Sequence, residues 1–194
     1  MAKVLTHMAM SLDGFIADPT DDPRELFDWY WGGDVTVPSA NDEMSFQVDE
    51  ASAVMLRDLL GGNGAIIAGR RLFDQTDGWG DHHPGAERIV VVTHRPVDDI
   101  DQRPNTTVAD SVEVAVAAAR EVAGDRNVTI ASPDIINQAL DLALVDEVWL
   151  SLVPVLFGEG IRYFGSRAHG HLMLEDPEVV QGRRALHLRY RVRR

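Results

Sequence analysis

The stretch of residues 128–160 constrains the fold most, because it predicts a strand, a helix and a second strand in close succession. Residues 128–130 form a short apolar run typical of a buried strand, and Ser132-Pro133 is a favoured pair at a helix start. Apolar residues then recur at helical spacing: Ile135, Ile136, Ala139, Leu140 and Ala143. The second strand is predicted at residues 148–153. A tight turn before a helix N-terminus can bind phosphate, so this unit is a candidate nucleotide site.

The rest of the chain predicts further strands and helices in one domain spanning residues 1–194. We expect strands at residues 4–10, 65–68, 88–92 and 106–108, and a closing hairpin of residues 172–180 with 185–192 around Gly182. Helices are expected at about residues 42–60, ended by Gly61, and from Ser111 to Ala123. Residues 18–40 lack clear periodicity and predict a long loop.

The charge of the chain bears on its partners. There are 18 Lys and Arg residues against 31 Asp and Glu residues, which gives a formal net charge of −13. Nucleic-acid binding needs a basic patch, so no nucleic-acid partner is expected. The basic run at residues 183–194 alternates with apolar residues and predicts a strand with arginines facing solvent. No targeting segment and no run of about 20 apolar residues is visible, so we expect a cytoplasmic protein with no membrane partner.

Aromatic residues gather in the expected loop, at Phe27, Trp29, Tyr30 and Trp31. Their flat apolar faces suit a substrate pocket, and they equally suit the core or a dimer interface. Both interpretations remain open from the sequence.

The histidines raise the possibility of a metal-dependent hydrolase using His82, His83 and His94. No third ligand lies at a recognisable spacing from the adjacent pair, so we expect no metal. The chain has no cysteine, which excludes disulfides and thiolate chemistry.

Three motifs in order carry a family resemblance: MAMSLDGFIAD near the N-terminus, IIAGRRLFD in the middle, and LVDEVWLSLVPVLFGEGIRYF after the predicted helix. They span positions 8–164 and resemble the RibD C-terminal family, the reductase domain of riboflavin biosynthesis. The resemblance implies an α/β domain of the dihydrofolate reductase-like fold, with a mainly parallel central sheet flanked by helices and an antiparallel C-terminal hairpin. It also implies a homodimer.

The resemblance further implies an NADPH-dependent reductase of a small-molecule substrate, similar to 5-amino-6-(5-phosphoribosylamino)uracil reductase. NADPH is expected over NADH because Thr93 and Arg95 match positions that surround the adenosine 2′-phosphate in this family. Gly69 permits close approach, and the Arg70 guanidinium suits phosphate oxygens. The cofactor-binding residues implied by the resemblance are Ala9, Gly14, Phe15, Ile16, Gly69, Arg70, Arg71, Thr93, His94, Arg95, Ala131, Ser132, Pro133, Asp134, Ile135, Phe157, Gly158, Glu159 and Gly160.

On the substrate side, Asp13 is the best candidate for a catalytic and substrate-contacting residue. Trp29 and Trp31 are candidates for the lining of the substrate pocket. No other well-placed acid emerges, so water is the expected proton donor.

Two positions depart from the resembled proteins. Ala131-Ser132 stands where the family usually has two glycines joined by a cis peptide facing the pyrophosphate, and Ser132 could donate its hydroxyl to a phosphate instead. Ala53 stands where dihydrofolate reductases carry a substrate-binding carboxylate, while Asp49 and Glu50 are expected at the surface. The missing carboxylate at Ala53 favours the riboflavin-type branch. Two alternatives stay open: a reductase of another small metabolite, and, because of Ala131-Ser132, a nucleotide-binding protein without catalysis.

Overall fold

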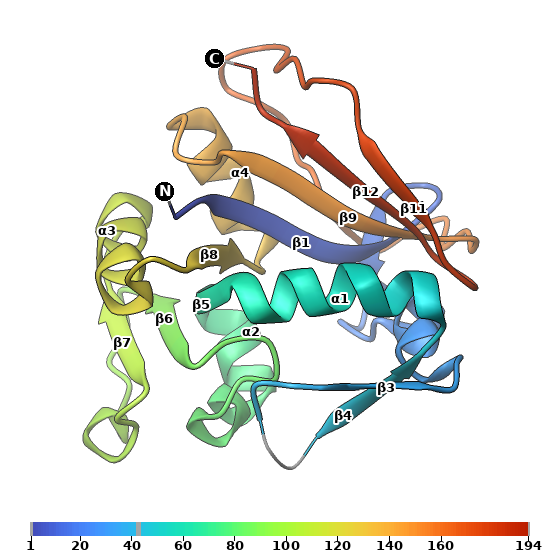
Figure 1. The fold of residues 1–194 in the computed structure, drawn as a ribbon. Helices are drawn as coiled ribbons and strands as arrows, with labels where there is room; N and C mark the ends of the chain where they lie inside the picture. The colour runs from blue at the N-terminus through green and yellow to red at the C-terminus, as the bar shows by residue number, and fades with distance from the viewer. Residues whose placement is uncertain (1, 42–43, 194) are drawn as a thin grey trace.

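The computed structural model describes residues 2–41 and 44–193 (Figure 1). Asp42, at the predicted start of the first long helix, and Arg194, at the end of the basic run, lie outside the described residues.

An eight-stranded sheet organises the described residues, in the order β11-β12-β9-β1-β8-β5-β6-β7. From β9 to β7 neighbouring strands run parallel, whereas β12 is antiparallel to β9 and β11 is antiparallel to β12. The strands are β1 (Val4–Ser11), β5 (Asn63–Gly69), β6 (Arg88–Val92), β7 (Thr106–Ala109), β8 (Asn127–Ile130), β9 (Glu147–Val153), β11 (Glu178–Gln181) and β12 (Leu186–Arg191). Continuous apolar runs form the central strands because both of their faces are covered. The predicted α/β fold with a mainly parallel sheet and antiparallel C-terminal strands is confirmed.

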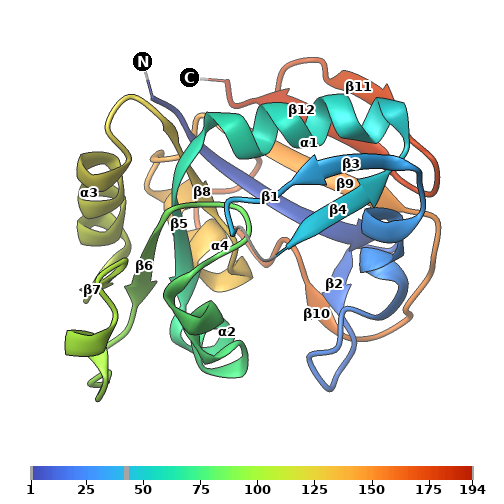
Figure 2. The ribbon, with the colours of Figure 1, turned by 60° about the horizontal axis from the view of Figure 1, so that its bottom comes forward.

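Two short sheets and several helices surround this sheet. One short sheet pairs β2 (Phe15–Ala17) with β10 (Ile161–Arg162), and the other pairs β3 (Val35–Pro38) with β4 (Ser45–Val48), beside the first helix (Figure 2). The α-helices are α1 (Glu50–Gly62), α2 (Arg70–Gln75), α3 (Val112–Ala123) and α4 (Pro133–Asp141). The 3₁₀ helices are η1 (Arg24–Trp31), η2 (Asp77–Asp81) and η3 (Ile100–Gln102).

The helices cover opposite faces of the sheet, because successive strand residues point to opposite sides. In β5, Ile67 packs in one core with α3 and α4, whereas Ile66 packs with Phe73 of α2 on the other face. The helix α1 covers β1 and β9 on the α2 side, through Leu56 and its neighbours. The sheet therefore lies between two helical layers.

Two predicted elements differ in the structure. Ser45–Val48 is a strand, and α1 begins only at Glu50, because the Asp49 carboxylate caps it by accepting the N–H groups of Ala51 (3.1 Å) and Ser52 (3.2 Å). Gly61 does not end this helix, which runs to Gly62. The long loop expected at residues 18–40 contains η1 and β3 instead.

The C-terminal hairpin forms around Gly182, as predicted, but its strands are shorter than expected. Arg189 also differs from the solvent-facing arginine expected there, because it pairs with the buried carboxylate of Glu147 at 2.9 Å. Among the described residues, no helix combines the length and apolar character needed to cross a membrane.

Candidate active site

A crevice opens where two neighbouring parallel strands end. After β5 the chain enters α2 on one face of the sheet, and after β8 it enters α4 on the other. In open α/β sheets, ligands bind at such a switch point, outside the carboxyl ends of the strands.

A cavity of about 1170 Å³ occupies this end of the sheet. It reaches from Met8 in β1 past the ends of β8, β5 and β6 to Asp110 after β7. Four strand spacings at about 4.8 Å each make this roughly 19 Å, so the shape suits an elongated ligand. The volume is somewhat above the usual range for ligand pockets, about 300–1,000 Å³.

One hydrogen bond joins the two sides of the crevice. The Gly69 N–H donates to the Ser132 hydroxyl oxygen at 2.7 Å. Ser132 lies at the N-cap position of α4, as predicted, but its side chain does not cap that helix. Since the oxygen accepts from Gly69, the hydroxyl hydrogen stays available to a ligand in the cavity. The two segments that the motifs single out are therefore adjacent in space.

Helix N-termini face the same cavity. Ser111, Val112 and Glu113 at the start of α3 line it, as do Pro133 and Asp134 at the start of α4. Exposed N–H groups and the helix dipole favour an anion at a helix N-terminus. The start of α4 lies beside Gly69 in the middle of the cavity and suits a phosphate group, whereas the start of α3 carries the acidic Asp110 and Glu113.

The structure brings together part of the predicted cofactor set. The predicted residues that line the cavity are Ile16, Gly69, Arg70, Arg71, Thr93, His94, Ala131, Ser132, Pro133, Asp134 and Ile135. Those that do not line it are Ala9, Gly14, Phe15, Arg95, Phe157, Gly158, Glu159 and Gly160.

The packing of β10 against β2 explains why a glycine stands at position 160. A Cβ atom at this position would lie 2.1 Å from the Ala17 carbonyl oxygen, and the φ angle is +141°. Glycine is therefore required for the close approach of the β10 segment to β2, independently of any cofactor.

Asp13, the predicted catalytic residue, holds two loops together. Its carboxylate accepts the Ser11 hydroxyl at 2.6 Å and the N–H groups of Phe157 (3.1 Å) and Gly158 (2.7 Å). The hydrogen bond from Ser11, together with those from the backbone, lowers the pKa of Asp13 to about 2. Asp13 does not line the cavity. In this structure the Asp13 carboxylate joins two loops, and its catalytic and substrate-contacting role stays a prediction.

The two tryptophans predicted to line a substrate pocket lie elsewhere. Trp29 is buried in the core beneath α1, stacked on Tyr30 with ring centroids 3.9 Å apart. Trp31 is exposed and lies against Phe46. Phe27 is the aromatic residue of this segment that lines the cavity. The sequence alone did not distinguish Phe27 from the neighbouring aromatic residues.

The predicted phosphate-binding arginines are engaged within the protein. The Arg70 Nε donates to Asp74 at 2.6 Å, and its Nη1 donates to the carbonyls of Arg95 and Pro96. Arg71 pairs with Asp21 of the segment after β2. Arg95 reaches Asp74 at 3.2 Å. Each guanidinium therefore fixes one loop around the cavity.

Sequence reasoning missed two segments of the lining. Thr20, Asp21, Asp22 and Pro23 border the cavity at the β2 side, and Asp110 with Glu113 borders it after β7. The second group could have been found from the sequence, because Asp110 lies two residues after the strand predicted at residues 106–108, and ligands bind at the carboxyl ends of such strands.

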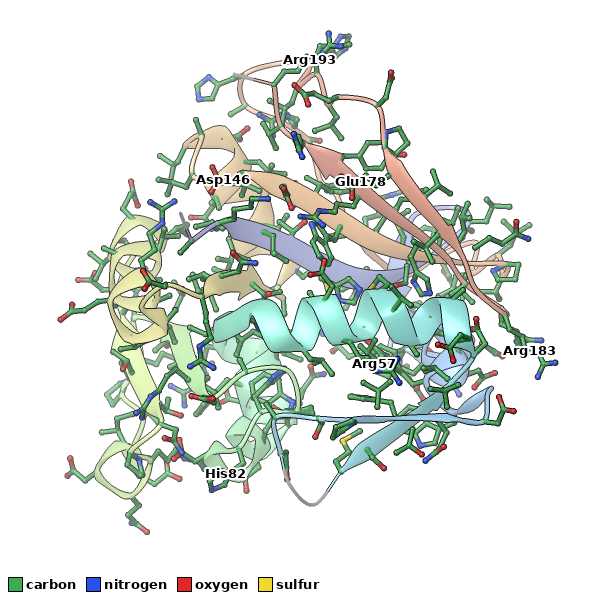
Figure 3. The ribbon with its side chains drawn as sticks, viewed as in Figure 1. Arg57, His82, Asp146, Glu178, Arg183 and Arg193 are labelled. Carbon is green, nitrogen blue, oxygen red and sulfur yellow. The ribbon has the colours of Figure 1, made fainter. Side chains whose placement is uncertain are left out.

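The three histidines considered as metal ligands do not lie together as one group. His82 follows η2 (Figure 3), whereas His94 follows β6 and lines the large cavity. Burial lowers the pKa of His83 to about 3, and its Nδ1 accepts the Gly85 N–H at 2.8 Å. In the part of the chain that the structure describes, no three His, Cys, Asp or Glu side chains are grouped as metal ligands.

The sequence matches the model of the RibD C-terminal domain over residues 2–188. The chain belongs to the RibD C-terminal domain family. Members of this family are typically NAD(P)H-dependent reductases of riboflavin biosynthesis. A comparison with curated proteins finds no match.

Solved structures share the fold of this family member. A candidate riboflavin biosynthesis protein from Shewanella sp. PV-4 aligns with a TM-score of 0.64 at 20% identity, over 99% of both chains. Riboflavin biosynthesis reductase Rib7 of Saccharomyces cerevisiae gives 0.62 at 13% identity, over 99% of this chain and 90% of that one. RibD of Acinetobacter baumannii gives 0.61 at 16% identity, and the match covers 100% of this chain but only 58% of RibD.

Proposed function

We propose that this chain is a reductase that binds a reduced nicotinamide dinucleotide across the carboxyl ends of β1, β8, β5 and β6. The observation that carries the proposal is the crevice between Gly69 and Ser132, which opens into one elongated cavity. Family membership supports the same chemistry.

The residues present fit such a cofactor. At the β1 end an apolar cluster of Met8, Ile16, Phe27 and Ile161 suits a nicotinamide ring, and residues 20–23 border this cluster. The middle of the cavity offers the N-terminus of α4 and the Ser132 hydroxyl to a pyrophosphate. We place the adenosine at the polar end of the cavity, beside Thr93 and His94. The bound cofactor would supply hydride, while the protein orients it and excludes water from the apolar end.

The family's type reaction sets the proposed substrate class, a ribosylaminopyrimidine phosphate whose ribosyl ring is reduced to a ribityl chain. A phosphorylated substrate needs a cation, and Arg71 is the exposed arginine that lines the cavity. We propose that Arg71 releases Asp21 and binds the substrate phosphate when the substrate enters the cavity. With the Asp13 carboxylate occupied, water is the proposed proton donor.

The experiment is a turnover assay. Protein, dinucleotide and 5-amino-6-(5-phosphoribosylamino)uracil are mixed, and loss of the reduced nicotinamide absorbance is followed. We expect turnover, and we expect Arg71→Met to raise KM for this substrate about tenfold, since a charge-assisted phosphate contact is lost. Arg57→Met, an exposed charge change on α1 (Figure 3), is the matched control and should leave KM unchanged.

Two outcomes separate the alternatives. Dinucleotide oxidation with a pterin, but not with the ribosylaminopyrimidine, would favour a reductase of another metabolite. Dinucleotide binding with no turnover of either substrate would favour a nucleotide-binding protein without catalysis, an alternative raised by Ala131-Ser132 in place of two glycines.

A further inference from the structure

The adenosine end of the cavity carries negative charge. Asp110 follows β7 directly, and Glu113 lies in the first turn of α3. Both side chains are exposed and line the cavity. Thr93 lies beside Asp110, because its N–H donates to the Ala109 carbonyl of the neighbouring strand at 2.9 Å. Among the described residues, neither acid has an ion-pair partner.

The arginines do not offset this charge. Arg70 and Arg71, the arginines that line the cavity, are paired with Asp74 and Asp21. Arg95, which the sequence suggested as a partner of the 2′-phosphate, lies outside the lining and reaches Asp74. A 2′-phosphate at this end would therefore meet the Asp110 and Glu113 carboxylates, whereas Arg71 is held by Asp21 on the β2 side of the cavity and Arg70 by Asp74.

We infer that the chain prefers NADH to NADPH, with Asp110 and Glu113 as the residues that set the preference. This inference rests on the proposed function and names the cofactor form of the same site. A ribose phosphate carries roughly −1.5 to −2 charges at neutral pH, which the two carboxylates repel. An acid after a parallel strand instead suits the free ribose hydroxyls of NADH, whereas an arginine suits the 2′-phosphate of NADPH. The inference reverses the sequence-based expectation of NADPH.

The first measurement compares the two dinucleotides on the purified full chain by nicotinamide fluorescence. We expect the dissociation constant for NADH to be at least about tenfold lower than that for NADPH at about 0.1 M salt. Added salt should reduce the difference between the two dissociation constants, because it screens the repulsion between exposed charges. Equal affinities, or tighter binding of NADPH, would overturn the inference and leave the proposed function standing. Failure of both dinucleotides to bind would overturn the proposed function itself.

The second measurement locates the preference in the two acids. The double variant Asp110→Asn, Glu113→Gln removes both charges and keeps the size of the side chains. We expect it to tighten NADPH binding about fivefold and to weaken NADH binding, because a neutral amide accepts a hydrogen bond from a ribose hydroxyl less strongly than a carboxylate does. Glu121→Gln, an exposed position on the same helix and outside the cavity lining, is the matched control and should change neither constant. An unchanged NADPH constant in a folded double variant would show that these acids do not set the preference.

Discussion

At the scale of single residues, Ser132 shapes the crevice. Its hydroxyl oxygen accepts the Gly69 N–H across the gap between β5 and β8 instead of capping α4. A glycine in its place would leave the Gly69 N–H free to face a ligand. With serine at position 132, the donor that faces a ligand is therefore the serine hydroxyl instead of the Gly69 N–H.

The change Ser132→Ala tests this role. The variant leaves a largely buried N–H group without its acceptor, so we expect the free energy of unfolding to fall by about 1 kcal/mol. The dissociation constant for the dinucleotide should rise about tenfold, because a hydrogen bond to a charged phosphate is lost. Urea unfolding and fluorescence titration measure the two effects. Ser132→Thr keeps the hydroxyl and is the control; an equal loss in both variants would exclude a hydroxyl role.

Sequence reasoning located Gly69 and Ser132 because both follow buried strands within recognisable motifs. The contacts of Asp13 and Trp29 could not be worked out from the sequence, for a physical reason. The N–H groups that occupy the Asp13 carboxylate belong to Phe157 and Gly158, far along the chain. Trp29 faces the core only because η1 turns it beneath α1.

At the scale of elements, a buried chain of hydrogen bonds joins α1 to three strands. The Ser52 hydroxyl donates to Asp49 (2.6 Å), so it accepts from His187 Nε2 (2.9 Å). When His187 is neutral, its Nδ1 accepts from the Ser151 hydroxyl (2.9 Å), whose oxygen accepts from His7 Nε2 (3.2 Å). Burial favours the neutral form of both histidines.

This network of hydrogen bonds predicts that the protein loses stability at acidic pH. Burial lowers the pKa of His187 to about 4, against a smaller raising effect of Asp49, and burial with the nearby His187 lowers the pKa of His7 to about 3. Below the ordinary histidine pKa of 6.5 the unfolded chain gains protons that the folded chain does not bind. Stability contributed by the neutral histidines is therefore present above pH 6.5 and is lost as pH falls toward 4.

Urea unfolding at about pH 7.5 and pH 5 measures this loss. We expect the wild-type free energy of unfolding to fall by at least about 1 kcal/mol between the two pH values. His187→Gln should reduce that fall, whereas His169→Gln, at an exposed position, should not. An identical pH dependence in wild type and His187→Gln would contradict the proposed neutral state.

The sequence predicted the parallel strands well, because a strand buried on both faces is a continuous apolar run. It missed β3 and β4, which are four residues each and pair mainly with each other. It extended α1 too far toward the N-terminus because the acidic residues before Asp49 lack a strand pattern. Short partly exposed strands are set by tertiary packing more than by local preference.

At the scale of the whole molecule, the order of strands creates the site. Only the placement of β8 between β1 and β5 brings Ser132 next to Gly69. The order of strands was implied by the family resemblance and could not be worked out from periodicity, since an apolar run does not specify its neighbours. The negative charge that Asp110 gives to one end of the cavity could be recognised only once this order of strands was known.

We propose that the chain forms a homodimer, as the family resemblance implied. Light scattering at micromolar concentration should give twice the mass of 21.4 kDa. A mass of one chain under these conditions would contradict the proposal.

The most direct test of the central claim is a crystal structure of the protein grown with saturating NADH. We predict the pyrophosphate between Gly69 and the start of α4, the nicotinamide near Ile16 and Ile161, and the adenosine near Thr93 and Asp110. A dinucleotide bound on another face, or a cavity without dinucleotide in crystals grown at saturating NADH and NADPH, would contradict the account.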